Sequence, residues 1–442
     1  MEEVLMRGRS TPQLSFGDGF IDPSLYEVSD ELKAVDTLLS DRALLKPLEE
    51  IFHPTMGCPG TPMDVYVRML FLKFRYGLSY EEVEQEVRER LPWRFFCHLS
   101  LMDRVPDATT LIKLNQRLGE DRIRQLNKRL VKHLIKSKKI KPRKIRIDST
   151  TLETHISYPT DLGLVHQVVK TLTESAKKAG HKITSHVRST KRALAQMGAV
   201  LKSKSKDSKQ QIRKTLQRVS RLAKDTLDEF STTLAQVRRG RNARAAQRLV
   251  EQRALAKTIL DQIDQRLAGA DSIPERIVSM HDPQARPIRR GKLGKPNEFG
   301  RTMQLTQDQS GLMLDYQIQH GNPNDKTKLI PMVERFVEQF GRAPTAVATD
   351  KGYYSPDNLA DLRQMGVRYV GIAKIGRLKP REYRRQHSRW FTTLQRFRCG
   401  MEAAISMLKR CFMLGDIRVR GSTATAVWVG WSIFSFNLWN FS

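Results

Sequence analysis

The sequence predicts an α/β protein in which a mixed-sheet core follows an all-helical domain and is interrupted, after its first strand, by a long helical insertion. The prediction rests on changes in hydrophobic period. Apolar residues keep helical spacing to about residue 135, alternate near 144–147, return to helical spacing from about 164 and alternate again from 301. The predicted N-terminal helical domain covers residues 1–135. The predicted core consists of two segments, 136–163 and 296–442, and the predicted insertion between them covers 164–295.

The composition narrows the classes of protein to be considered. The 442 residues include 77 Lys and Arg but only 47 Asp and Glu, a net charge of +30, so a polyanionic partner is expected and nucleic acid is the simplest one. Four cysteines lack metal-ligand spacing, which favours reduced thiols in a cytosolic protein. The first ten residues lack the apolar segment of a signal peptide.

The N-terminal domain shows three helix-start signals. Thr61-Pro62 resembles a cap before an apolar helix, Ser79-Tyr-Glu-Glu82 is a capping box, and a turn at 106–110 precedes a helix beginning near Leu111. Short helices with tight turns in a basic protein favour a helix-turn-helix-like DNA-binding module over the alternative, an all-helical scaffold.

The first strand of the core alternates Ile145 and Ile147 with basic residues and is expected to end on Asp148. The following insertion has apolar residues at four-three spacing on both sides of a turn at Gly240 and Asn242, which predicts an antiparallel helical hairpin with a narrow seam instead of a globular core. Its early part, 182–214, is dense in Lys and Arg. It is expected to be a solvated coiled coil, or an arm that lies along DNA or grips a second subunit.

After the insertion the pattern predicts the rest of the sheet. The expected elements, in order, are a hairpin of strands at 301–306 and 311–318, a helix at 325–340, a strand ending at Asp350, a helix from Ser355, a strand at 367–373 and a helix across 395–410. The apolar stretch 424–441 contains Ser, Thr and Asn residues, so a buried terminal helix or strand-plus-helix is expected there, with no membrane span.

Three acids are the candidate catalytic residues. Asp148 and Asp350 each follow an apolar strand, and reactive groups gather at the carboxyl ends of strands in α/β sheets. Glu402 shares one helix face with Arg398 and Lys409. Three converging carboxylates in so basic a chain fit Mg²⁺, which prefers carboxylate oxygen. The alternative for each acid taken singly is a turn, a cap or a solvated ion pair.

Several segments resemble bacterial insertion-sequence DDE transposases. The similar segments are Ile147-Asp148-Ser-Thr-Thr-Leu-Glu153 with Tyr158-Pro-Thr-Asp161, Lys295-Pro-Asn-Glu298-Phe-Gly300, Ala348-Thr-Asp350-Lys-Gly352-Tyr353 and the Pro106–Leu111 turn. Arg398, Glu402 and Lys409 match most of a Tyr-(2)-Arg-(3)-Glu-(6)-Lys signature, with Gln395 in place of the Tyr. The ISNCY-type branch is the most similar group that we can name.

The resemblance implies a ribonuclease-H-like core with Asp148, Asp350 and Glu402 as a metal-binding triad. The implied cofactor is two Mg²⁺, for which Mn²⁺ substitutes, and the implied reaction is cleavage at transposon ends followed by strand transfer into target DNA. Arg398 and Lys409 are expected to contact phosphates; the further predicted DNA contacts are Lys351, Arg410 and Trp390, with core packing as the alternative for Trp390.

The implied partners are double-stranded DNA, as transposon ends and target, and a second subunit, because two ends must be held together in a homodimer or a larger homo-oligomer. A cytoplasmic, nucleoid-associated location without a membrane is expected. Two alternatives remain on the same core: a Mg²⁺-dependent nuclease that cuts DNA without joining it, and a non-catalytic DNA-binding protein.

Overall fold

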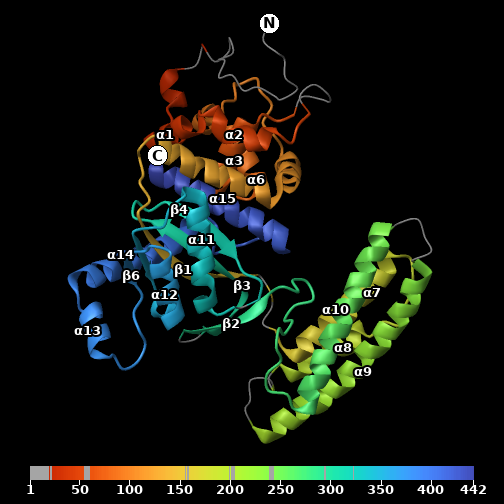
Figure 1. Cartoon of the computed structure of the whole chain (residues 1–442). Coiled ribbons are helices and arrows are strands. Elements are labelled where there is room, and N and C mark those ends of the chain that lie inside the picture. The colour runs from red at the N-terminus through yellow and green to blue at the C-terminus, as the bar shows by residue number, and fades with distance from the viewer. Residues whose placement is uncertain are drawn as a thin grey trace. The chain divides into compact units, whose positions relative to one another are not determined.

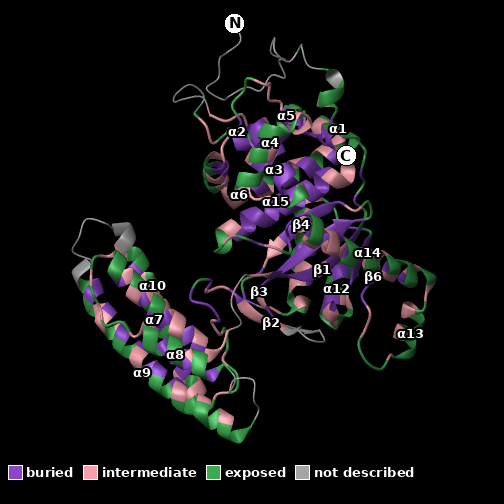
Figure 2. Ribbon diagram, turned by 180° about the vertical axis from the view of Figure 1, so that it is seen from behind, coloured by how far each residue is buried: buried purple, intermediate pink, exposed green. Residues whose placement is uncertain are grey.

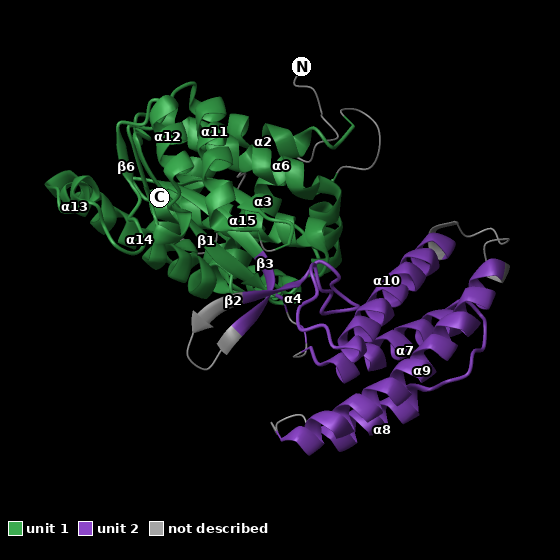
Figure 3. Ribbon diagram, turned by 60° about the horizontal axis from the view of Figure 1, so that its bottom comes forward, with its two compact units in different colours: residues 1–153, 302–442 green, residues 154–301 purple. Residues whose placement is uncertain are grey.

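The computed structural model describes residues 19, 22–53, 60–154, 156, 159–198, 200, 205–237, 243–292, 295–321 and 323–442. They form two compact units, residues 1–153 with 302–442 and residues 154–301 (Figure 3). The predicted turn at Gly240 and Asn242, together with Tyr158, lies outside the described residues. The boundary predicted at residue 135 falls inside the first unit.

The first unit contains most of the sheet and the helices on either side of it (Figure 1). Its helices are α1 (Asp30–Leu39), α2 (Arg42–Glu49), α3 (Met63–Tyr76), α4 (Tyr80–Glu89), α5 (Leu91–Phe96), α6 (Ala108–Lys136), α11 (Leu329–Phe340), α12 (Pro356–Gln364), α13 (Pro380–Gln386), α14 (Arg389–Cys411) and α15 (Ser422–Phe441), with short 3-10 turns at Pro23–Tyr26, Asp325–Lys328 and Lys351–Tyr353.

Among the described residues the sheet has six strands of mixed direction, which confirms the predicted α/β class. The strands are β1 (Lys144–Glu153), β2 (Arg286–Lys292), β3 (Lys295–Asp308), β4 (Met313–Ile318), β5 (Ala346–Thr349) and β6 (Tyr369–Gly371). Their order is β2-β3-β1-β5-β6, and β4 pairs with β3 away from that row. The β1–β5 and β5–β6 pairs are parallel, whereas β2–β3 and β3–β4 are antiparallel.

Helix α15 is buried along most of its length, as the sequence predicted for the C-terminal stretch (Figure 2). Several of its polar residues are hydrogen-bonded inside the protein: Asn437 bonds both the N–H and the C=O of Met313 on β4, and the Trp431 indole donates to Asn115 on α6 over 2.8 Å. Among the described residues, no helix is long and apolar enough to cross a membrane.

The second unit is a helical bundle with its own buried core, so the prediction of a hairpin without a globular core was wrong. Its helices are α7 (Asp161–Lys178), α8 (Val187–Met197), α9 (Lys206–Val237) and α10 (Ala243–Ala268). Helix α7 packs against α8, α9 and α10. Val165, Val169 and Leu172 of α7 are fully buried and belong to two apolar clusters shared with α9 and α10.

Part of the hairpin prediction holds. Lys224 pairs with Asp264, whereas Arg253, earlier on α10, donates to Ser231, later on α9. The contacts therefore run in opposite directions along the two helices, and α9 and α10 are antiparallel.

Several element boundaries differ from the predicted ones. Strand β1 does not end on Asp148 but continues to Glu153, because residues 149–152 are buried and include the β-branched Thr150 and Thr151. Helix α6 begins at Ala108, since Asp107 caps it by accepting the Thr110 N–H over 2.7 Å.

Two other boundaries moved by less. Helix α3 begins at Met63, and its N-cap is Pro62, not Thr61. Strand β6 is shorter than predicted, covering only Tyr369–Gly371. The capping box at Ser79 and Glu82 is confirmed, as is the start of α12 after Ser355.

Candidate active site

The two predicted aspartates are neighbours because of the parallel register of β1 and β5. The last pair of that register joins Ile147 to Thr349, so the next residues along the two chain segments are Asp148 and Asp350. Adjacent strands lie about 4.8 Å apart. Asp148 is therefore at the end of the pairing with β5 even though β1 itself continues.

Asp148 is in an environment that opposes its negative charge. Burial, together with the nearby carboxylates of Asp350 and Asp325, raises its pKa to about 6 against the opposing effects of the Ser149 N–H and the Arg398 guanidinium. The Ser149 backbone N–H donates to the Asp148 carboxylate over 2.7 Å. A positive charge placed near this carboxylate would therefore stabilise its ionised form.

Asp325 is an acid of this site that the sequence reasoning missed. Its carboxylate accepts the Ser149 hydroxyl over 3.2 Å and the Gln304 side-chain amide over 2.8 Å, and Tyr353 in turn donates to Gln304. In the sequence Asp325 reads only as the first residue of the helix that follows β4, so nothing there distinguished it from a helix-start acid.

Helix α14 lies against β1, β5 and β6, and side-chain hydrogen bonds hold it there. Arg146 on β1 donates to the Phe397 carbonyl of α14 over 2.6 Å, and it also donates to Gln307 on β3 over 2.8 Å. Gln395 donates to the Gly371 carbonyl at the end of β6 over 2.7 Å. The residue that replaces the signature Tyr thus has a structural contact of its own.

Gly400 allows the Arg146 contact to form. A Cβ atom at Gly400 would collide with the Arg146 guanidinium, which lies over the Phe397 ring at 4.8 Å from its centroid. The glycine is therefore a close-approach position between a strand and a helix. It lies between Arg398 and Glu402, the two charged residues that α14 presents at this site.

Arg398 and Glu402 form an ion pair one helical turn apart, with Nη1 and Oε1 separated by 3.1 Å. Arg398 is largely buried, at 17% side-chain exposure, whereas Glu402 is 65% exposed. Burial opposes the charge of Arg398, but Cys399, Glu402 and Asp350 outweigh it and raise its pKa. Arg398 therefore connects the aspartates electrostatically with Glu402.

The predicted DNA contacts have different surroundings. Lys351 and Arg410 are exposed, and Lys409 is half-buried in the last turn of α14. Trp390 is half-buried with its ring 5.5 Å from that of Tyr369, beside an apolar cluster that contains Leu394. That packing fits the core alternative for Trp390.

The donors at this site fit a hard divalent cation in their chemistry, since Asp148, Asp350 and Glu402 offer only carboxylate oxygens. The two aspartates lie side by side, and burial disfavours the charge of Asp148. Within the described part of the chain, no three His, Cys, Asp or Glu side chains are grouped closely enough to hold a metal ion. The expected close cluster of three acids is therefore not formed here, and Glu402 is held by Arg398 instead.

Parts of the chain are similar to known proteins. The family described as "Transposase domain (DUF772)" matches residues 24–117, and the family described as "Transposase DDE domain" matches residues 255–438. A protein of Rhizobium meliloti described as "Uncharacterized protein ORF8 in nfe locus" is 28% identical over 148 residues, which cover 32% of this chain and 72% of that protein. No solved structure matches.

The two family matches define the chain as a transposase with a DDE domain. The chain belongs to the bacterial insertion-sequence DDE transposases, which catalyse metal-dependent DNA cleavage and strand transfer. It is therefore a DNA transposase, and DNA is its partner. The DDE match includes Asp350 and Glu402, whereas Asp148 lies in neither matched stretch.

Proposed function

We propose that Asp148, Asp350 and Glu402 are the catalytic acids of this transposase and that the core around them is ribonuclease-H-like. The adjacency of the two aspartates, fixed by the β1–β5 register, is the observation that supports this most directly. Two Mg²⁺ ions held by these carboxylates would activate the attacking oxygen and stabilise the leaving oxygen of the phosphodiester, and Mn²⁺ would substitute.

In this proposal Glu402 leaves Arg398 to complete the site. The pair is an i,i+4 contact with an exposed carboxylate, and such pairs contribute only about 0.3–0.5 kcal/mol. Rotation of Glu402 toward the aspartates is therefore inexpensive. It releases Arg398 to contact a DNA phosphate, with Lys409, Lys351 and Arg410 as further cations near the same end of the sheet.

We also propose that the N-terminal helices, residues 1–135, bind DNA in a helix-turn-helix-like manner and that the active assembly holds two transposon ends in a dimer or larger oligomer. The support is the charge of +30 and the succession of short helices α1 to α5. Neither the terminal sequence nor the target preference enters this proposal.

The test is a strand-transfer assay on DNA that carries both ends of the mobile element encoding this chain. Asp148→Asn, Asp350→Asn and Glu402→Gln each remove one metal-binding charge, and a loss of several kcal/mol of transition-state stabilisation corresponds to about a thousand-fold lower rate. The matched control is Asp361→Asn, which neutralises an exposed acid on α12.

Full joining activity in the Asp350→Asn variant contradicts the proposed triad. Metal-dependent cutting by the wild-type protein without any joined product would instead support the nuclease alternative. Cleavage and joining are scored separately on the same gel, so the two outcomes are distinguished. Circular dichroism of each variant checks that the loss is not one of folding.

A further inference from the structure

We infer that helix α9 carries a second DNA-binding surface, a row of cations that follows the phosphate backbone of duplex DNA. The surface is here called the α9 stripe and consists of Lys209, Lys214, Arg218 and Arg221, all exposed in the structure. It rests on the function proposed above and adds a binding site to it. Residues 118–254, which include all of α9, lie outside both family matches.

The sequence of α9 gives the stripe an unusual charge pattern. Between Asp207 and Asp225 the helix contains six Lys and Arg residues and no Asp or Glu. Lys214, Arg218 and Arg221 follow at i, i+4 and i+7, so they share one helix face. Like charges at this spacing destabilise a helix, and no carboxylate lies within the stretch itself; Asp225, just beyond it, follows Arg221 at i+4.

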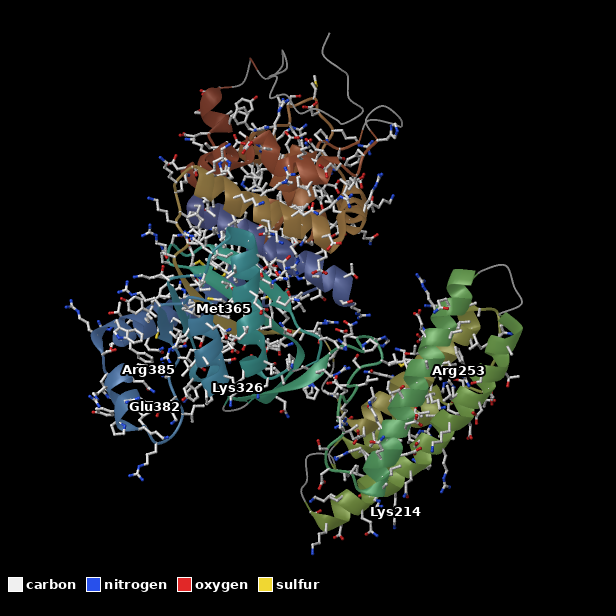
Figure 4. The ribbon with its side chains drawn as sticks, in the orientation of Figure 1. Lys214, Arg253, Lys326, Met365, Glu382 and Arg385 are labelled. Carbon is white, nitrogen blue, oxygen red and sulfur yellow. The ribbon has the colours of Figure 1, made fainter. Side chains whose placement is uncertain are left out.

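The bundle itself does not use these side chains. Leu216, Val219 and Ala223 form the buried face of the same stretch, in a cluster shared with α7, α8 and α10. Buried and exposed residues alternate along α9 (Figure 2), and Lys214 is labelled in Figure 4. The stripe is thus on the side of the helix that the core leaves to solvent.

Two other cations of the stretch are already engaged, which separates them from the stripe. Arg213 donates to the Leu267 carbonyl over 2.8 Å, and Lys224 pairs with Asp264 at 2.8 Å. For the side chains of Lys209, Lys214, Arg218 and Arg221 the structure records neither a hydrogen bond nor an ion pair among the described residues.

The neighbouring helix extends the positive surface. Helix α8 packs against α9 and contains Arg188, Lys191 and Arg192, all exposed, and no acidic residue. The nearest carboxylates on α9, Asp207 and Asp225, lie just outside the stripe, and others of the bundle are on α7, where Glu174 lies beside Lys170, and on α10, at Asp264. Mutual repulsion of these cations destabilises such a surface when nothing is bound to it, and a bound polyanion would relieve that repulsion.

The dimensions of the stripe fit duplex DNA. At 1.5 Å per residue, Lys209 to Arg221 covers about 18 Å of helix, or roughly five phosphate spacings along one DNA strand. Exposed aromatic side chains are absent from the stripe, so it offers no stacking platform for single-stranded bases. The expected contact is therefore to backbone phosphates, without base recognition.

The test measures binding of the full-length protein to a fluorescein-labelled duplex of arbitrary sequence by anisotropy, across a series of KCl concentrations. The stripe variant combines Lys214→Gln, Arg218→Gln and Arg221→Gln. The slope of log affinity against log salt is expected to become shallower by about 0.9 for each lost phosphate contact, about 2.7 in all. At ~0.1 M salt this corresponds to about a 500-fold loss of affinity.

The matched control combines Lys170→Gln, Arg248→Gln and Lys257→Gln, three exposed cations on α7 and α10 of the same bundle. It has the same change in net charge and is expected to retain most of the slope. An equal fall in both variants, or an unchanged slope in the stripe variant, overturns the inference. The melting temperature of the stripe variant should be unchanged or higher, because like-charge repulsion is removed.

A subunit contact is the other outcome that the experiment detects. If the stripe variant changes the oligomeric state without DNA, in sedimentation velocity, and keeps the wild-type salt slope, the stripe binds a second copy of the chain and the inference is wrong. If the wild-type protein itself shows no salt-dependent DNA binding, the failure concerns DNA binding by the whole protein and is distinguished from a failure of the α9 stripe.

Discussion

Replacing Gly400 with alanine tests how closely helix α14 must approach the sheet. The new Cβ atom would collide with the Arg146 guanidinium, so the side chain must leave its bond to the Phe397 carbonyl. Losing a hydrogen bond to a charged group costs about 3 kcal/mol at most, while the better helix propensity of alanine returns about 1 kcal/mol. The net expectation is a destabilisation of about 2 kcal/mol.

The double variant Arg146→Met with Gly400→Ala makes this reasoning falsifiable. Methionine keeps the stem of the side chain over the Phe397 ring but lacks all three guanidinium atoms that a Cβ at Gly400 would meet. In the Arg146→Met background, Gly400→Ala should therefore stabilise the protein by about 1 kcal/mol. The coupling between the two sites is about 3 kcal/mol.

Calorimetry of the four proteins in this cycle gives the comparison. With about 2 °C for each kcal/mol in a protein of this size, Gly400→Ala should lower the melting temperature by about 4 °C in the wild-type background and raise it by about 2 °C beside Arg146→Met. A Gly400→Ala protein that melts at the wild-type temperature and transfers strands at the wild-type rate refutes the argument, because α14 would then tolerate the displacement.

Three further predictions follow from single contacts. Gln395→Ala removes the bond to the Gly371 carbonyl and should lower the stability by about 1 kcal/mol, measured by urea unfolding. Burial lowers the pKa of Lys73 to about 8, so the folded protein binds this proton less tightly than the unfolded chain; the stability of the wild type relative to Lys73→Met should rise between pH 8 and 10.5, and a flat difference contradicts this. Burial lowers the pKa of His98, but hydrogen bonds to Asp36 and Asp64 outweigh it and raise the pKa above 6.5. The contribution of His98 is therefore complete below pH 6.5 and lost as the pH rises through the higher folded pKa, and thermal melts of His98→Gln across this range should lack that loss.

The sequence was a good guide to elements whose pattern is local. The alternation around Ile145 and Ile147 predicted a strand whose isoleucines are fully buried, and a helix was predicted across 395–410, where α14 buries Met401 and Leu408. The Asp350 strand end was also correct. Each of these depends on burial of one face, which a hydrophobic period reports directly.

The failures concern what an element packs against. Helix α7 has the same apolar period as α9 and α10, and a period shows which face is buried without naming its neighbours, so a bundle was mistaken for a hairpin. Strand β2, Arg286–Lys292, was missed because it is basic throughout most of its length and has no apolar alternation. It forms through pairing with β3, in which Arg286 lies opposite Gly300.

Asp325 shows why the candidate site was predicted incompletely. A strand-end Asp can be recognised from the apolar run before it, whereas Asp325 reaches the site through bonds to Ser149 and Gln304, which are far from it in the sequence. Those contacts depend on how the segment after β4 folds back over the sheet.

The position of Arg398 depends on the contacts that hold α14 against the sheet. It places a positive charge and the negative charge of Glu402 on one helix beside the aspartates. Helix α14 is held at Gln395 and at Phe397, within one turn of Arg398, so this arginine is the charged side chain of α14 that is best fixed against the sheet. Its pKa is raised by Asp350 as well as by Glu402, which shows that it is attracted by both. In the proposed site, cations held by the aspartates would screen the attraction of Asp350 for Arg398. The arginine and Glu402 would then be free to separate, which would leave the carboxylate available to a metal and the guanidinium available to a phosphate.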